Sequence, residues 1–204
     1  MRIRILSISI ITLFFPLYTL RMNSKETKEI NASSFYNFKD VAIDGSEVDF
    51  TRFKGEVSLI VNTACTCGLA KEGFETIRKL QEEFKDLNVL LFPSAFSKIV
   101  NQEKNTPEEI LQEIKKANIT VGGRVVVFSK RVIDSSKGIF DWLTRNYEKT
   151  GWLNIKAIKW NFTMFVVDRT GTKVVRHDPL AAKYPEVKKT IEKFYSAELP
   201  NNSK

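Results

Sequence analysis

The sequence is poor in the residues that build disulfide frameworks and metal sites. Its 204 residues include two cysteines, Cys65 and Cys67, and one histidine, His177. Two cysteines exclude a disulfide-dense small protein. A zinc site of cysteine and histidine ligands needs four of them, and the chain has three such side chains in total. We therefore expect no metal and no bound cofactor, and we interpret His177 as a surface residue.

The chain also lacks a convincing membrane span. The uncharged run ILSISIITLFFPLYTL, residues 5–20, contains Pro16 and falls short of the roughly 20 residues that a spanning helix needs. A basic head precedes it and a polar segment follows, which is the layout of a secretory signal. We predict a signal peptide or an uncleaved signal anchor over residues 1–22 and a polar linker over 23–34. The predicted location is the endoplasmic reticulum lumen or outside the cell, with membrane attachment only if the segment is uncleaved; a leader to another compartment is a further alternative.

No segment is dominated by charge of one sign. The 32 Lys and Arg residues exceed the 24 Asp and Glu residues by eight, but the two signs are interleaved along most of the chain. This pattern indicates solvated helix faces rather than a nucleic-acid or membrane surface. The length suits one globular domain, which we place at residues 35–197, before a polar tail at 198–204.

From about Phe35 the pattern alternates between strands and helices. The pair Asp44-Gly45 between two strand-like segments predicts an N-terminal β-hairpin. Thr106 and Pro107 have the residue types of an N-cap and a first helical position. Further strands are expected at 56–64, 88–94 (ended by Pro93) and 124–128, a second hairpin at 162–177, and helices at 70–87, 106–118, 138–150 and 184–199. This order predicts a three-layer α/β fold, with a mixed central sheet and helices on both faces.

Both cysteines lie in VNTACTCGLA, residues 61–70, between a buried strand that ends near Ala64 and the start of a helix. A helix N-terminus offers unpaired N–H groups and the positive end of the helix dipole, and both favour a thiolate over a thiol. Because the thiolate is the nucleophilic form, this position predicts a reactive Cys67. A structural, buried Cys67 is the alternative that position alone leaves open.

The same segment resembles the active-site turn of the glutathione peroxidases, V-N-x-A-S-x-C/U-G-x-T. A second block, KWNFTMFVVDRTGTKVV at 159–175, is similar to the family's K-W-N-F-x-K-F-L-V-x-x-x-G-x-V-V. The resemblance extends over about Phe35 to Tyr195. It implies a thioredoxin-like fold, a role against oxidative stress, and reduction of hydrogen peroxide or organic hydroperoxides by a cysteine that passes through a sulfenic acid. The apparent leader is similar to cysteine-type members of the secretory pathway.

The resemblance also assigns site residues. Cys67 stands at the peroxidatic position, and Trp160 and Asn161 match the tryptophan and asparagine whose N–H groups face the sulfur in the family. No bound cofactor is implied. The expected partners are a hydroperoxide and an external thiol reductant, such as glutathione, a thioredoxin-like protein or a protein disulfide isomerase.

Two departures from the family pattern concern the reaction. The motif F-P-C-N-Q-F supplies a catalytic glutamine, but this chain has Ser94-Ala95-Phe96 in place of C-N-Q. Ser94, Ser97 and Gln102 are the alternative donors. A resolving cysteine in the helix after the second strand is also missing.

Cys65 stands where the family usually has serine, which leaves two interpretations. It either attacks the sulfenic acid of Cys67 as a resolving cysteine, through a small strained ring, or it is a small buried residue at a strand end. Our main functional prediction is a cysteine-dependent peroxidase. The alternatives are a thiol–disulfide exchange or redox-sensing module that uses Cys65 and Cys67, and a homologue that has lost catalysis and binds a partner.

Overall fold

The computed structural model describes residues 34–96, 100–148, 157–180 and 182–198. The predicted leader, nearly all of the linker and most of the polar tail lie outside these ranges and stay predictions. Within the ranges, no helix combines the length and the hydropathy that crossing a membrane requires.

The N-terminal hairpin is confirmed. Strands β1 (Lys39–Val41) and β2 (Glu47–Asp49) pair antiparallel across the turn at Asp44 and Gly45. The sequence pattern did not predict the two short 3₁₀ helices that flank the hairpin, η1 (Phe35–Asn37) and η2 (Phe50–Phe53). The hairpin therefore begins later than the apolar pattern at Phe35 suggested.

The central sheet is mixed, as predicted. Its strands run in the order β5 (Val125–Val127), β4 (Asn88–Ala95), β3 (Ser58–Thr63), β7 (Met164–Val167) and β8 (Val174–His177). β3, β4 and β5 are parallel to one another, whereas β7 is antiparallel to β3 and to β8. The short β6 (Arg131–Val132) pairs with the end of β4. β3 is therefore central, with a partner on each side.

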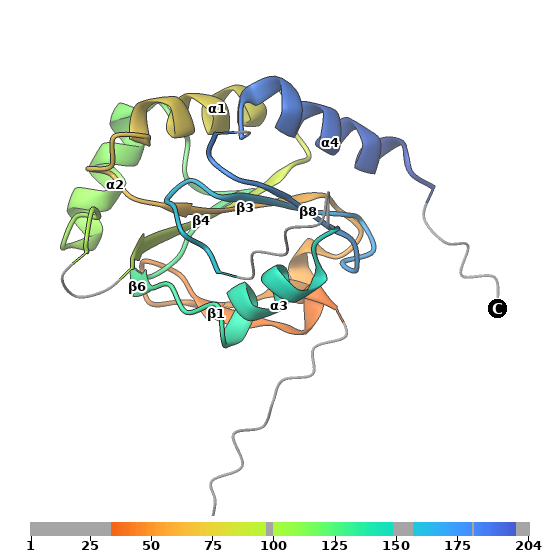
Figure 1. The fold of residues 1–204 in the computed structure, drawn as a ribbon, viewed down its shortest axis with the longest axis horizontal. Coiled ribbons are helices and arrows are strands. Elements are labelled where there is room, and N and C mark those ends of the chain that lie inside the picture. Colours follow the sequence, from red (N-terminus) through yellow and green to blue (C-terminus); the bar gives the residue numbers. More distant parts are fainter. Residues whose placement is uncertain (1–33, 97–99, 149–156, 181, 199–204) are drawn as a thin grey trace, which may run out of the picture. The chain divides into compact units, whose positions relative to one another are not determined.

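Helices cover both faces of the sheet. Helices α1 (Ala70–Glu83), α2 (Pro107–Lys116) and α4 (Tyr184–Ser196) lie on one face, and α3 (Gly138–Asn146) lies on the other with the N-terminal hairpin (Figure 1). The strands supply both hydrophobic cores because neighbouring side chains point to opposite faces.

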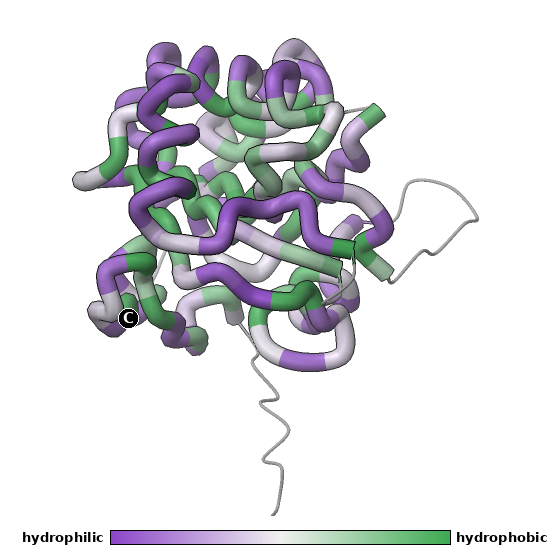
Figure 2. Tube along the Cα trace, turned by 90° about the vertical axis from the view of Figure 1, so that its left-hand side faces the viewer, coloured by the Kyte–Doolittle hydropathy of each residue, from purple (hydrophilic) through white to green (hydrophobic). Residues whose placement is uncertain are grey.

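The alternation is visible residue by residue in β3. Leu59 and Val61 pack in the core under α1, whereas Ile60 packs in the core under α3. The helices are amphipathic: hydrophilic and hydrophobic residues alternate along them (Figure 2). In α1, Phe74, Ile77 and Leu80 are buried at three-residue spacing, which places them on one face of the helix.

Two local predictions have opposite outcomes. Thr106 caps α2 as expected: its side chain accepts the N–H of Glu109, and the Glu109 side chain accepts the Thr106 N–H in return. The prediction that Pro93 ends its strand is wrong, because β4 continues to Ala95. Pro93 lies between the residues of β4 that pair with β5 and those that pair with β6, so its missing N–H removes no bond from those two ladders.

Candidate active site

The turn between β3 and α1 holds both cysteines. Cys67 donates its N–H to the Ala64 carbonyl at 3.2 Å, and its own carbonyl accepts the N–H of Ala70 at 3.0 Å. The half-buried sulfur accepts the N–H of Leu69, with nitrogen and sulfur 3.4 Å apart. Leu69 is the N-cap of α1 and offers no side-chain acceptor of its own. Cys67 therefore lies where the sequence predicted it, at a helix N-terminus with a backbone donor on its sulfur.

A second turn, at residues 160–163 before β7, is fastened to β3 by Asn62. The side chain of Asn62 accepts the N–H of Thr163 at 3.1 Å and donates to the Trp160 carbonyl at 3.1 Å. The Asn62 carbonyl accepts the N–H of Phe162 at 2.7 Å. Asn62 is fully buried, and its side chain and backbone together hold the second turn against β3. Asn62 is not among the predicted site residues, although an amide within the strand segment EVSLIVNTA was an available signal.

Phe162 brings this turn against the start of α1. Its backbone has a φ of 61°, which is uncommon for a bulky residue. Its ring lies so close to Gly73 that a Cβ there would be 2.2 Å from the ring carbon Cδ1. The ring also packs edge-on against Phe74, with centroids 5.1 Å apart. A glycine at position 73 therefore allows the helix that follows Cys67 and the turn that carries Asn161 to meet.

Trp160 and Asn161 differ in their exposure to solvent. Asn161 is 3% exposed, and its Nδ2 donates to Oε1 of Gln102 at 2.9 Å. Its Oδ1 is buried and has no partner among the described residues. Trp160 is 63% exposed, and its indole has no hydrogen bond to Cys67 among the described side chains. The roles of both residues in the reaction stay predictions.

The three alternative donors, Ser94, Ser97 and Gln102, differ in their position and their contacts. Ser94 is fully buried and donates its hydroxyl to the Thr63 carbonyl at 3.1 Å, so it is already used. Ser97 lies outside the described residues. Phe96 packs against the core on the α3 side. Of the three, Gln102 is the one that the structure joins to a predicted site residue, Asn161.

The segment that carries Gln102 also holds Cys65. A carboxylate oxygen of Glu103 accepts the N–H of Cys65 at 3.0 Å. Burial, followed by the hydrogen bond and negative charge of Glu103, raises the pKa of the Cys65 thiol far above its ordinary value. The side chain lines a hollow of about 310 Å³ between α1 and α2. Cys65 and Cys67 are both free thiols, in different surroundings.

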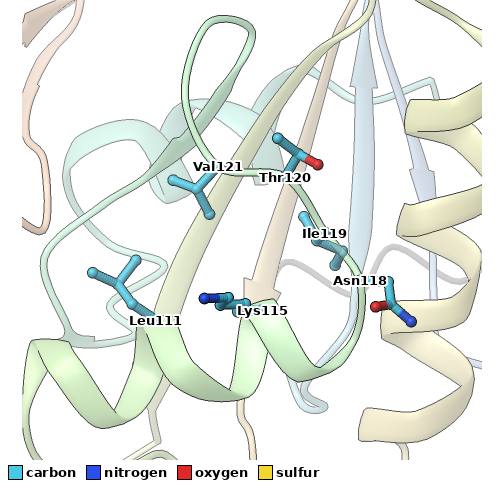
Figure 3. Close-up of a pocket in the computed structure, with 6 residues that line it drawn as sticks. All are labelled: Leu111, Lys115, Asn118, Ile119, Thr120 and Val121. Carbon is cyan, nitrogen blue, oxygen red and sulfur yellow. The ribbon is translucent and has the colours of Figure 1, made fainter.

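The remaining candidate features lie outside this site. His177 is half-buried rather than fully exposed, and its Nε2 lies 3.0 Å from the Thr190 hydroxyl, so the surface prediction holds only in part. A hollow of about 550 Å³ beside the end of α2 is lined by side chains that include neither cysteine and no predicted site residue (Figure 3). In the described ranges no three His, Cys, Asp or Glu side chains gather closely enough to hold a metal ion.

Comparison with known proteins gives a consistent picture. Residues 35–144, more than half of the chain, match the family model described as Glutathione peroxidase. The chain is 36% identical over 164 residues to the glutathione peroxidase homolog BsaA of Staphylococcus epidermidis, covering 79% of this chain and 98% of that protein. It is 32% identical over 177 residues to a probable phospholipid hydroperoxide glutathione peroxidase of Mesembryanthemum crystallinum, covering 85% and 98%.

Solved structures agree on the fold. The crystal structure of T. cruzi GPX1 matches with a TM-score of 0.58 and 28% identity, covering 79% of this chain and 95% of that one. A secreted disulfide oxidoreductase of Mycobacterium tuberculosis matches with a TM-score of 0.52 over 78% of this chain and 96% of that one, at 11% identity, which concerns the fold alone.

The three-layer fold, a sheet with helices on both faces, and the cysteine at the start of α1 thus define a thioredoxin-like protein with a thiol site. Within that class, the chain belongs to the glutathione peroxidase family and is a thiol-dependent peroxidase.

Proposed function

We propose that Cys67 is the residue that reduces the hydroperoxide, either hydrogen peroxide or an organic hydroperoxide. Its thiolate attacks one peroxide oxygen, and the O–O bond breaks. Cys67 becomes a sulfenic acid, and the second oxygen takes up a proton and leaves as water or as an alcohol. An external thiol then reduces the sulfenic acid in two steps, releasing water and forming a disulfide of the reductant.

The observation that carries this proposal is the position of the Cys67 sulfur. The residue is half-buried, its sulfur accepts the Leu69 N–H, and it lies at the positive end of α1. A helix N-terminus is a common setting for reactive cysteines, and the partial exposure of Cys67 agrees with access for a peroxide. Asn161 is one proposed donor, because its contact with Gln102 uses one of its two amide N–H groups, and Trp160 is the second proposed donor.

An external reductant agrees better with the surroundings of Cys65 than a resolving role for it. The raised pKa keeps Cys65 protonated, and a thiol attacks a sulfenic acid far more slowly than a thiolate does. The proposed reductant is glutathione or a protein thiol of the thioredoxin or disulfide isomerase type. The name of the Mesembryanthemum relative supports lipid hydroperoxides as one organic substrate.

The test is the rate at which hydrogen peroxide oxidises the reduced protein, followed by trapping of the sulfenic acid and intact mass. We expect oxidation much faster than that of free cysteine, and its complete loss in Cys67→Ser. Cys65→Ser is the matched control, because it removes a thiol two residues away in a different environment; it should keep the wild-type rate within about twofold.

A wild-type rate no better than that of free cysteine would refute the assignment of Cys67. A normal rate in Cys67→Ser with loss in Cys65→Ser would move the reaction to the other thiol. Melting temperatures of the two variants, measured alongside, show whether either substitution acts through folding.

A further inference from the structure

Residues 101–103 form a clamp across the turn that carries the cysteines. The Gln102 carbonyl accepts two hydrogen bonds from Thr66, from its N–H at 2.9 Å and from its hydroxyl at 2.7 Å. Glu103 takes the Cys65 N–H, and its own N–H is held by Asn101 at 3.0 Å. The backbone of Gln102 is thus fixed next to Cys67 by groups other than its side chain.

The Gln102 side chain is consequently free to reach the other turn of the site. Its Oε1 accepts one N–H of Asn161 at 2.9 Å. A primary amide has two N–H donors and one acceptor oxygen. The contact therefore occupies one donor of Asn161 and leaves its second N–H, while the buried Oδ1 has no partner among the described residues. Because a buried amide oxygen without a partner is costly, the orientation of the Asn161 amide depends on the contact that it does make, with Gln102.

We propose that Gln102 is a positioning residue for the peroxide reaction: it holds the Asn161 amide so that the remaining N–H contacts the hydroperoxide. The N–H stabilises the negative charge that develops on the leaving oxygen as the O–O bond breaks. This inference rests on the proposed function of Cys67, because the amide serves no purpose without an attacking thiolate.

The backbone of Gln102 holds the cysteine turn, whereas its side chain contacts Asn161. The two bonds from Thr66 end on the backbone carbonyl, which every substitution at position 102 retains. Gln102 is exposed, whereas its partner Asn161 is almost completely buried. Truncation to alanine thus removes the side-chain contact and leaves the clamp in place.

The experiment is a double-mutant cycle on the rate of Cys67 oxidation by hydrogen peroxide. The proteins are the wild type, Gln102→Ala, Asn161→Ala and the double variant. We expect Gln102→Ala to lower the rate about tenfold, a size typical of contacting residues. In the Asn161→Ala background the same substitution should have less than about a twofold effect, because the group it positions is gone.

Two further readouts distinguish positioning from loosening of the clamp. Alkylation of Cys67 by iodoacetamide needs a thiolate but no peroxide contact, so Gln102→Ala should leave its rate unchanged. The slow labelling of Cys65 should also stay unchanged, because Glu103 keeps its contacts. Gln112→Ala, which removes an exposed glutamine of α2, is the matched control.

A wild-type rate in Gln102→Ala would overturn the inference, and so would effects of the two substitutions that simply multiply in the double variant. An equal loss of peroxide and iodoacetamide reactivity would also overturn it. The proposed function fails separately, if the wild-type protein itself reacts no faster than free cysteine.

Discussion

At the scale of single residues, two thiols in one turn have different surroundings. Cys67 lies at the start of α1, where a backbone N–H reaches its sulfur. Cys65 lies two residues earlier, beside the buried carboxylate of Glu103, and burial raises its pKa. The spacing alone could not separate them, because the difference comes from Glu103, which is 38 residues further along the chain.

The same scale separates the two proposed donors, Trp160 and Asn161. A donor that is already removed from water contributes more to the transition state than one that water solvates. We therefore predict that Asn161→Ala lowers the rate of Cys67 oxidation by about 10²–10³, whereas Trp160→Phe lowers it by about tenfold or less. Stopped-flow measurement with hydrogen peroxide compares the variants. Equal losses would contradict the prediction and mean that the indole moves onto the reacting atoms when peroxide binds.

At the scale of elements, His177 joins β8 to α4 through its contact with the Thr190 hydroxyl. Burial lowers the pKa of His177, and the nearby charges of Glu186 and Asp178 oppose this only in part. Because its folded pKa lies below the value of about 6.5 in an unfolded chain, the unfolded state binds the proton more readily. Stability should therefore fall as the pH drops below about 6.5 and be unaffected by this group above it.

The measurement is thermal unfolding of the wild type and of His177→Gln at about pH 7.5 and about pH 5.5. Glutamine keeps a hydrogen-bonding group but does not titrate, so the variant should lose less melting temperature between the two conditions. Over this interval the carboxylates stay ionised and contribute little to the difference. An identical loss in both proteins would show that His177 is not the group responsible.

Elements built from local signals were the ones that the sequence predicted well. Asp44-Gly45 placed the first hairpin, and Thr106 with Pro107 placed the start of α2, because turns and caps depend on residues a few positions apart. The prediction that Pro93 ends its strand was wrong because the cost of the missing proline N–H depends on which neighbouring strand pairs at that position. β6, with two residues, exists only through its pairing with β4 and has no pattern of its own.

The site likewise has one part that local sequence signals predict and one part that depends on long-range contacts. The position of Cys67 followed from a strand that ends and a helix that begins nearby. The contact between Gln102 and Asn161 joins residues 59 positions apart, and the bonds of Asn62 to the second turn span about 100 positions. Such contacts depend on the strand order β4-β3-β7, which brings the three segments together at one end of the sheet.

At the scale of the whole molecule, the chain has two thiols and no third to resolve the sulfenic acid. The catalytic cycle then depends on how those two are distributed. Cys67 lies at the start of α1, whereas Cys65 lines the hollow between α1 and α2, where burial raises the pKa of its thiol. We therefore expect the oxidised protein to be reduced by an external thiol rather than to form an internal disulfide.

This dependence gives the last prediction. With hydrogen peroxide and no reductant, the intact mass should rise by one oxygen atom and should not fall by two hydrogen atoms, as an internal disulfide would require. Turnover should then increase in proportion to the concentration of added glutathione or of a thioredoxin-like protein, because the external thiol carries the resolving step. Cys65→Ser should have the same mass change and the same dependence as the wild type. A mass loss of two hydrogens that requires Cys65 would instead establish the internal exchange, and would mean that peroxide attack at Cys67 rearranges the turn enough to release Cys65 from Glu103.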